Sequence, residues 1–129
     1  MILLDTCAVI WDALDPARLS QAAARAIEQN DGELMVCDIS LWEIAMLMEK
    51  GRVQVAAPAA EFIRLALQSR NYAVQEITPE IAELSARLGA DGLADPADRL
   101  IAATSILLQA PLVTADERLR SIGAVPAVW

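Results

Sequence analysis

Carboxylates are the main chemistry-bearing side chains of this sequence. Nine Asp and nine Glu residues stand against nine arginines and one lysine, Lys50, which gives a formal net charge of −8. The chain has no histidine, which excludes serine triads, histidine-based ribonuclease chemistry and nearly all catalytic zinc sites. Gly51 and Arg52 follow Lys50, so the Gly-Lys-Ser/Thr of a phosphate-binding loop is missing. The charge argues against nucleic-acid binding through a broad basic surface, but it leaves a metal-dependent site open.

Five acids stand where predicted strands end or predicted helices begin. Two of them follow short apolar runs within two residues, and the other three lie at or near the starts of predicted helices. They are Asp5, Glu43, Asp95, Asp98 and Asp116. In a parallel sheet all carboxyl ends lie at the same edge, and ligands bind in the crevice outside it. The pattern therefore predicts that these scattered acids meet at one edge of the sheet.

Helix capping is the alternative explanation for the same acids. Asp and Ser are good N-cap residues, and Ser40-x-x-Glu43 has the form of a capping box, as does the helix start at Asp95 and Asp98. A cap stabilises by about 1 kcal/mol, whereas two carboxylates roughly 4 Å apart repel by about 4 kcal/mol at an effective dielectric constant near 20. Acids that converge must therefore be neutralised by protons or cations. Oxygen ligands without His or Cys favour Mg²⁺ or Mn²⁺.

Short apolar runs that alternate with helical patterns predict the elements that position these acids. We expect strands at 2–4, 34–37, 72–77, 112–114 and 125–128. We expect helices at 7–14, 19–29, 40–50, 58–69, 78–88, 95–109 and 116–121. Short strands that are apolar on both faces are typical of a parallel sheet covered by helices on both sides. The sequence predicts a single α/β domain over residues 1–129 with a short central sheet of four or five parallel strands.

Composition also bounds the compartment. No apolar run approaches the roughly 18 residues of a membrane span, and Asp5 interrupts the N-terminal apolar run after four residues. We therefore expect a soluble, cytoplasmic protein with no membrane contact. Cys7 and Cys37 are the two cysteines, and we expect reduced, buried thiols that pack as small hydrophobic groups.

Four segments of the chain together resemble PIN-domain ribonucleases and, at this length, the VapC-type toxins of VapBC toxin–antitoxin pairs. The segments are Leu3-Leu4-Asp5-Thr6, Ser40-Leu41-Trp42-Glu43-Ile44, the run from Asp95 to Thr104, and Leu112-Val113-Thr114-Ala115-Asp116-Glu117-Arg118. Their order and spacing carry the resemblance, which spans residues 2–120. Many members of the family have a histidine shortly before the Asp-Pro pair, where this chain has Gly92-Leu93-Ala94. That departure concerns substrate contacts or the local loop and leaves the acids intact.

The resemblance implies an acidic quartet that holds Mg²⁺ or Mn²⁺, formed by Asp5, Glu43, Asp98 and Asp116. It implies that the quartet is supported by neighbouring polar side chains, namely Thr6, Ser40, Asp95 and Thr114. It further implies hydrolysis of RNA phosphodiester bonds by metal-activated water, with 5′-phosphate and 3′-hydroxyl products. A cognate VapB-type antitoxin that plugs the site and a homodimer are the partners that the family implies.

Two other features suggest where RNA and protein partners bind. Arg99 and Arg118 closely follow Asp98 and Asp116, so we expect them to contact RNA phosphates; alternatively, Arg99 pairs with an acid on its own helix turn. The predicted helix 40–50 is apolar almost all round, which indicates either core burial or, with Trp11 and residues 59–67, a groove for an antitoxin helix or a second subunit.

Two other functions remain alternatives. A catalytically silent PIN-like module that only binds protein would have the same fold, although intact acids weigh against it. A metal-dependent phosphatase also places an Asp after its first strand, but it uses a late lysine, and no lysine follows Lys50. Such a phosphatase also has a second Asp at the position of Cys7. An endoribonuclease is therefore the favoured prediction.

Overall fold

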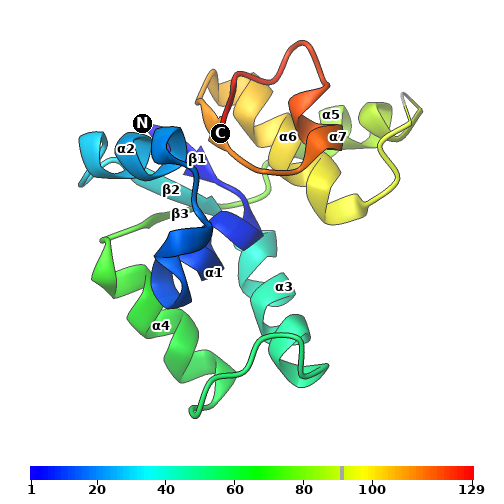
Figure 1. Cartoon of the computed structure of the whole chain (residues 1–129). Helices are drawn as coiled ribbons and strands as arrows, with labels where there is room; N and C mark the ends of the chain where they lie inside the picture. The colour runs from blue at the N-terminus through cyan, green and yellow to red at the C-terminus, as the bar shows by residue number, and fades with distance from the viewer. Residues whose placement is uncertain (91) are drawn as a thin grey trace.

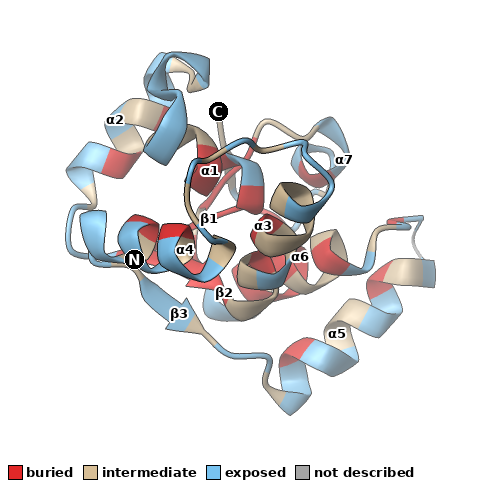
Figure 2. Cartoon of the chain, turned by 90° about the horizontal axis from the view of Figure 1, so that it is seen from below, coloured by how far each residue is buried: buried red, intermediate tan, exposed pale blue. Residues whose placement is uncertain are grey.

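One parallel sheet forms the centre of the protein, whose structure is a computed structural model that describes residues 1–90 and 92–129. In these residues the sheet has five strands in the order β3-β2-β1-β4-β5. The strands are β1 (Ile2–Leu4), β2 (Leu34–Cys37), β3 (Ala73–Gln75), β4 (Leu112–Val113) and β5 (Ala127–Val128). Each predicted strand is present, although the strands at the two edges are shorter than predicted. β3 is largely exposed at its edge of the sheet (Figure 2), so the prediction of strands covered on both faces is wrong for β3.

The central strand β1 brings its two neighbours together at the edge where ligands bind. Leu4 pairs with Val36 of β2 on one side and with Val113 of β4 on the other. The chain winds from β1 through β2 to β3 in one direction, and β4 and β5 lie on the opposite side. The strand order therefore reverses between β1 and β4, and such a reversal opens a crevice at the carboxyl ends of the strands. Asp5 follows β1 directly at this point.

Helices cover both faces of the sheet, as predicted (Figure 1). Alternate β1 residues pack into two separate cores: Leu4 lies with Ile27 and Phe62, whereas Leu3 lies with Ile101. The first core involves α1, α2 and α4, and the second involves α5, α6 and α7. The helices are α1 (Thr6–Leu14), the 3₁₀ helix η1 (Pro16–Arg18), α2 (Gln21–Gln29), α3 (Asp38–Glu49), α4 (Ala59–Ser69), α5 (Pro79–Ala90), α6 (Pro96–Leu108) and α7 (Glu117–Arg120). The predicted α/β class and two-sided covering are confirmed.

The start of α3 corrects one prediction. The helix begins at Asp38 with Cys37 as its N-cap, two residues before the predicted start. Ser40 is therefore a fully buried residue of the first turn, and Glu43 lies in the second turn rather than the first. The capping-box interpretation of Ser40 and Glu43 is wrong, because neither residue is at the helix end. This leaves both side chains available for contacts with other elements.

Two smaller differences concern α2 and Cys7. The helix predicted from residue 19 begins at Gln21, where Ser20 caps it by accepting a hydrogen bond from the Ala23 backbone amide at 3.0 Å. The short helix η1 precedes it and was not predicted. Cys7 is exposed, so the prediction of a buried thiol is wrong for Cys7 and right for Cys37; both cysteines are free. In residues 1–90 and 92–129, no helix is long and apolar enough to span a membrane.

An ion pair fixes α1, the helix that follows Asp5, against the end of α4. Arg70 donates to both carboxylate oxygens of Asp12, at 3.0 and 2.9 Å. The Asp12 side chain is only 5% exposed, whereas that of Arg70 is 33% exposed. The Tyr72 hydroxyl lies 3.4 Å from the same carboxylate. Because a bidentate pair holds both side chains in one geometry, it fixes the orientation of α1.

We predict that Arg70→Met lowers the free energy of unfolding by about 2–3 kcal/mol, because it leaves the Asp12 carboxylate buried without its cation. Urea denaturation of the two proteins measures this loss. Arg87→Met is the matched control: Arg87 pairs with Glu83 on the exposed surface of α5 and should cost less than about 0.5 kcal/mol. Equal losses for the two variants would contradict the structural role of the Asp12 pair.

Candidate active site

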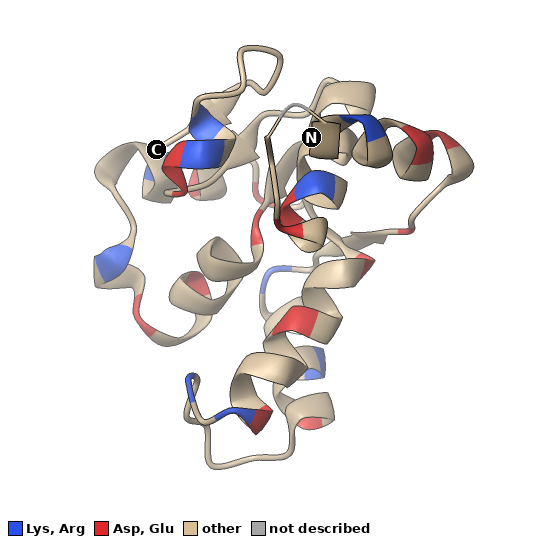
Figure 3. Ribbon diagram, turned by 90° about the vertical axis from the view of Figure 1, so that its right-hand side faces the viewer, with Lys and Arg blue, Asp and Glu red and all other residues tan. Residues whose placement is uncertain are grey.

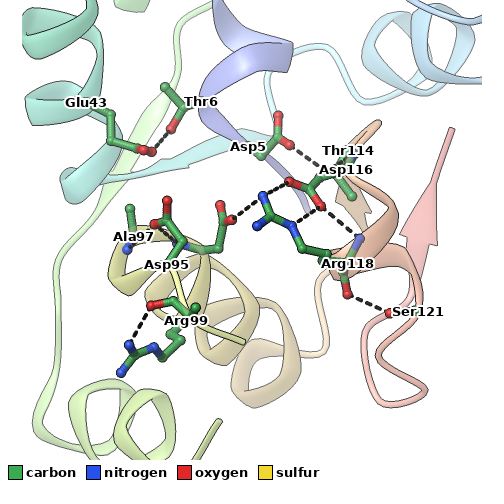
Figure 4. Close-up of polar contacts among 12 residues, drawn as sticks. Asp5, Thr6, Glu43, Asp95, Ala97, Arg99, Thr114, Asp116, Arg118 and Ser121 are labelled. Carbon is green, nitrogen blue, oxygen red and sulfur yellow. Dashed lines mark hydrogen bonds and ion pairs between the residues drawn. The ribbon is translucent and has the colours of Figure 1, made fainter. Parts of the chain in front are cut away.

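The five predicted acids line a single pocket of about 360 Å³ at the carboxyl ends of β1 and β4. They come from four different parts of the chain: the start of α1, the middle of α3, the start of α6 and the start of α7. The lining residues are Asp5, Thr6, Cys7, Trp11, Glu43, Leu47, Asp95, Asp98, Ala115, Asp116 and Arg118. A larger hollow between α3 and α4 contains only one acid, Glu49. The carboxylate chemistry is therefore gathered at the sheet edge (Figure 4).

Asp5 is the most buried acid of the pocket, with 7% of its surface exposed. It is the N-cap of α1, and its Oδ1 accepts a hydrogen bond from the Ala8 amide at 2.8 Å. Its Oδ2 accepts a hydrogen bond from the Thr114 hydroxyl, and Thr114 Oγ1 in turn accepts from the Asp116 amide at 3.1 Å. Burial raises the pKa of Asp5 to about 6, against these hydrogen bonds, with Asp116 and Glu43 adding to the rise. Two hydrogen bonds therefore fix the Asp5 carboxylate in a position close to other negatively charged side chains.

Asp95 and Asp98 have different environments on the same helix turn. Asp95 is the N-cap of α6 and accepts hydrogen bonds from the amides of Ala97 at 2.9 Å and Asp98 at 3.2 Å. The capping explanation thus holds for Asp95. The pKa of Asp98 is raised to about 7, chiefly by burial and also by the charges of Asp95, Asp116 and Glu43, against the opposing charge of Arg118. Asp98 therefore carries the largest electrostatic penalty of ionisation in the pocket.

Glu43 reaches the pocket from α3 and is held by α1. The Thr6 hydroxyl donates to Glu43 Oε1, and Thr6 Oγ1 lies 2.9 Å from the hydroxyl oxygen of Ser40. Burial raises the pKa of Glu43; the Thr6 hydrogen bond opposes this rise and the charge of Asp95 adds to it. Thr6 and Ser40 are thus placed beside Glu43, and Thr114 beside Asp5, as the sequence comparison implied. Their role in supporting a metal site stays a prediction.

Arg118 is the counter-ion of two acids. Asp116 caps α7 and accepts a hydrogen bond from the Arg118 amide at 2.8 Å, while Arg118 Nη2 lies 3.3 Å from Asp116 Oδ2. The same nitrogen lies 3.9 Å from Asp98 Oδ2. Burial acts to raise the pKa of Asp116, but the hydrogen bonds and the charge of Arg118 outweigh it and lower the pKa. The guanidinium therefore offsets part of the repulsion between Asp98 and Asp116.

Arg99 does not join this network. Its Nη2 donates to the Ala94 carbonyl at 2.6 Å, and its guanidinium packs so closely on Gly89 that a Cβ there would lie 2.8 Å from Nη1. Figure 4 shows the guanidinium turned away from Asp95. In the described residues Arg99 forms no ion pair with Asp95 or Asp98, so the alternative of a pair on its own helix turn is wrong. The RNA contact of Arg99 stays a prediction.

The fold and this pocket agree with a known family. A family model of the PIN domain matches residues 2–125. The chain belongs to the PIN domain family. It is 44% identical to Ribonuclease VapC22 of Mycobacterium tuberculosis over 121 residues, which cover 93% of this chain and 90% of that protein. The resemblance to PIN-domain ribonucleases of the VapC type is therefore confirmed.

Solved structures of toxin–antitoxin proteins share the fold over nearly the whole chain. A toxin–antitoxin complex from Klebsiella pneumoniae matches with a TM-score of 0.69 and 23% identity, covering 97% of this chain and 95% of the other. A DNA-bound VapBC from Salmonella typhimurium matches with a TM-score of 0.72 and 17% identity, covering 98% and 97%. At these identities the likeness concerns the arrangement of the backbone.

The donor set of this PIN domain fits a hard divalent cation. All the side chains that could ligate at the acid pocket carry oxygen, apart from the Cys7 thiol. Burial is the main cause of the raised pKa values of Asp5 and Asp98, and the neighbouring acids add to it. Among the described residues, however, no three His, Cys, Asp or Glu side chains stand arranged to hold an ion. Arg118 pairs with two of the acids, Asp98 and Asp116.

Cys7 is a pocket residue that the sequence reasoning did not identify. Partial burial and the charges of Asp5, Glu43 and Asp98 raise the pKa of its thiol to about 11. The thiol therefore stays protonated at neutral pH and is a poor nucleophile and a poor metal ligand. The sequence feature that could have identified Cys7 is its position two residues after Asp5, in the first turn of α1.

We predict that Asp98→Asn stabilises the protein at pH 8 without divalent cations, by roughly 1–2 kcal/mol. The pKa of Asp98 is raised to about 7, so the folded state binds its proton more tightly than the unfolded state does. Protonated Asp98 therefore contributes stability below pH 4, and this contribution is lost as the pH rises through about 7. The asparagine of the variant does not ionise, so the variant does not lose stability in this way.

Chemical denaturation across this pH range measures the effect. Asp116→Asn is the control: the pKa of Asp116 is lowered by Arg118, so that variant should lose stability at pH 8. A loss of stability for Asp98→Asn at pH 8 would mean that the pocket acids do not repel one another.

Proposed function

We propose that this PIN domain is the toxin of a type II toxin–antitoxin pair, an endoribonuclease that hydrolyses RNA phosphodiester bonds with water and depends on Mg²⁺ or Mn²⁺. The observation that carries the proposal is the convergence of Asp5, Glu43, Asp98 and Asp116 on one pocket at the reversal of strand order. The 44% identity to a ribonuclease over nearly the whole chain supports the same activity. The proposed role of each acid follows from its position.

Asp5, Asp98 and Asp116 would hold the cation, and Glu43 would orient the attacking water or help to hold a second ion. When bound, a divalent cation lowers the pKa of coordinated water and stabilises negative charge on the phosphoryl oxygens. The Thr114 hydroxyl and the Ala8 amide fix the Asp5 carboxylate. Asp5 would therefore keep its position while the other carboxylates adjust to a bound cation. With no histidine in the chain, a carboxylate or solvent accepts the proton of the attacking water.

Glu43 is the carboxylate best placed to accept that proton. Thr6 holds its Oε1, and no described residue hydrogen-bonds to Oε2. The side chain is partly buried, which raises its pKa and makes it a stronger base than an exposed glutamate. Attack by external water leaves the 2′-hydroxyl of the ribose unused, so no cyclic phosphate forms. The bond from phosphorus to the 3′ oxygen breaks and that oxygen takes up a proton, which gives the 5′-phosphate and 3′-hydroxyl ends that the family resemblance implies.

A VapB-type antitoxin is the proposed protein partner, and a homodimer the proposed assembly. Relatives that share this fold were solved as toxin–antitoxin complexes, which supports the first. Two large apolar side chains on the α3 and α4 surface, Trp42 and Leu65, are 59% and 57% exposed. These are side chains that such a partner would cover.

A catalytically silent PIN domain is the second candidate. One specific observation favours it: the described carboxylates form no ready-made metal cage, and an internal cation, Arg118, already pairs with two of them. Such a module would act only through its antitoxin. RNA cleavage and metal binding separate the two candidates.

We predict that the purified protein cleaves cellular RNA in Mg²⁺ or Mn²⁺ and not in chelator. Asp5→Asn should reduce the rate by roughly 100-fold or more, because it removes a charge that positions the cation. Glu28→Gln, on the exposed face of α2, makes the same charge change away from the pocket and should cleave normally. Gel analysis and sequencing of the new ends measure rate and end chemistry. Cleavage that persists in chelator, or that survives Asp5→Asn, would contradict the proposed function.

We predict that Arg118→Gln tightens Mn²⁺ binding roughly threefold to fivefold, because the guanidinium and the cation compete for Asp98 and Asp116. Isothermal titration calorimetry measures the affinity without any need for RNA cleavage. Arg120→Gln removes the same charge from the same short helix, where Arg120 forms no ion pair with a described residue, and should leave the affinity within twofold or so. Weaker binding by Arg118→Gln would show that Arg118 does not compete with the cation.

A further inference from the structure

We infer that a second pocket, directly beside the acid pocket, binds the RNA strand next to the cleavage point by holding a backbone phosphate between Arg18 and Arg52. The inference rests on the proposed function and adds to it a binding subsite for single-stranded RNA. The subsite is formed by residues outside the four segments that resemble the family and outside the acidic quartet.

The two pockets are continuous. The second pocket has a volume of about 360 Å³ and lies between α1, η1 and the segment that follows α3. Three residues line both pockets: Cys7, Trp11 and Leu47. A strand whose phosphodiester lies among the acids can therefore pass over these three residues into the second pocket without leaving the surface.

Arg18 is held in place by aromatic rings. Its guanidinium carbon lies 4.5 Å from the centre of the Trp11 ring, and Trp11 packs on Trp129 with 5.7 Å between ring centres. A guanidinium stacked on an aromatic face keeps its N–H groups free for ligands in the plane of the fork. In the described residues the Arg18 side chain has no hydrogen bond and no ion pair. The Arg18 guanidinium is therefore a hydrogen-bond donor that is already held in position and pairs with no acceptor among the described residues.

Arg52 completes the basic side of the pocket. It is exposed in the segment after α3, and its side chain contacts no carboxylate of the described chain. By contrast, Arg70, Arg87 and Arg118 all pair with carboxylates. One acid, Asp15, also lines the pocket, so two guanidiniums face one carboxylate. The pocket is therefore basic in a protein whose net charge is −8.

The charge distribution favours RNA as the occupant. In the view of Figure 3, basic and acidic positions are scattered among one another along the ribbon. Cys7, Trp11 and Leu47 line both pockets. A polyanion that passes over them out of the acid pocket therefore meets Arg18 and Arg52, which form no ion pair with a described carboxylate. Guanidinium forks bind phosphate in bidentate fashion, which suits this position.

The test compares two double variants in the non-cleaving Asp5→Asn protein. Arg18→Gln with Arg52→Gln removes the proposed phosphate contacts, and Arg25→Gln with Arg64→Gln removes equal charge from the exposed faces of α2 and α4. The probe is a short fluorescein-labelled single-stranded RNA of mixed sequence, and fluorescence anisotropy measures its affinity at several salt concentrations. The first pair should weaken binding roughly tenfold and reduce the slope of log K against log salt by about 0.7, the value expected for one phosphate contact on a single strand. The control pair should leave the slope unchanged.

Cleavage kinetics in the otherwise native protein give an independent readout. Arg18→Gln with Arg52→Gln should raise KM roughly tenfold and leave kcat nearly unchanged, because the subsite contributes binding that is equal in ground state and transition state. Unchanged RNA affinity and KM in an enzyme that still cleaves RNA would overturn the subsite and leave the proposed function standing. Loss of antitoxin binding with unchanged RNA affinity would assign the pocket to a protein partner and overturn the inference as well. If the unmodified protein neither binds nor cleaves RNA, the proposed function fails and the subsite fails with it.

Discussion

Repulsion among partly buried carboxylates is the constraint on which the functional edge of this protein depends. Asp5, Glu43 and Asp98 all have raised pKa values because burial and neighbouring acids penalise their charges. A fold optimised only for stability would separate such groups, since each pair costs more than a helix cap returns. The parallel sheet instead forces Asp5 and Thr114 side by side, because Leu4 and Val113 are register partners. The acids converge as a consequence of topology.

The same side chains both cap helices and line the pocket. Asp5, Asp95 and Asp116 each accept a hydrogen bond from an amide in the first turn of the helix they begin. Capping fixes one carboxylate oxygen and leaves the other for a second contact, which Thr114 makes with Asp5 and Arg118 with Asp116, so capping orients the acid as well as stabilising the helix. Capping and catalysis are therefore not exclusive explanations of an acid at a helix start. Asp98 is not the N-cap of a helix, and its pKa is raised more than that of the other pocket acids. No capping interaction within the described helix α6 explains why an acid stands at this position.

The sequence was sufficient for the fold class and for the grouping of the acids, because both follow from short-range patterns. Apolar runs located all the strands, and parallel pairing then placed the ends of β1 and β4 together. Contacts that depend on tertiary packing could not be predicted in this way. Ser40 matched a capping box, but α3 starts two residues earlier, and its hydroxyl packs against Thr6 instead. The exposure of Cys7 also differs from prediction, and Arg99 donates to the Ala94 carbonyl where the alternative prediction had an ion pair with an acid of its own helix turn.

Short-range charge, more than net charge, determines how this acidic protein meets a polyanion. At physiological ionic strength interactions between exposed charges are largely screened beyond about 8 Å, so most of the net charge of −8 has little effect on a phosphate at the pocket. The charged side chains that line the acid pocket are the acids and Arg118, and Arg18 and Arg52 line the pocket beside it. The net negative charge of the protein does not attract a polyanion over long range, so steering does not accelerate encounter. Discrimination between strands must then come from how a bound strand fits the two connected pockets.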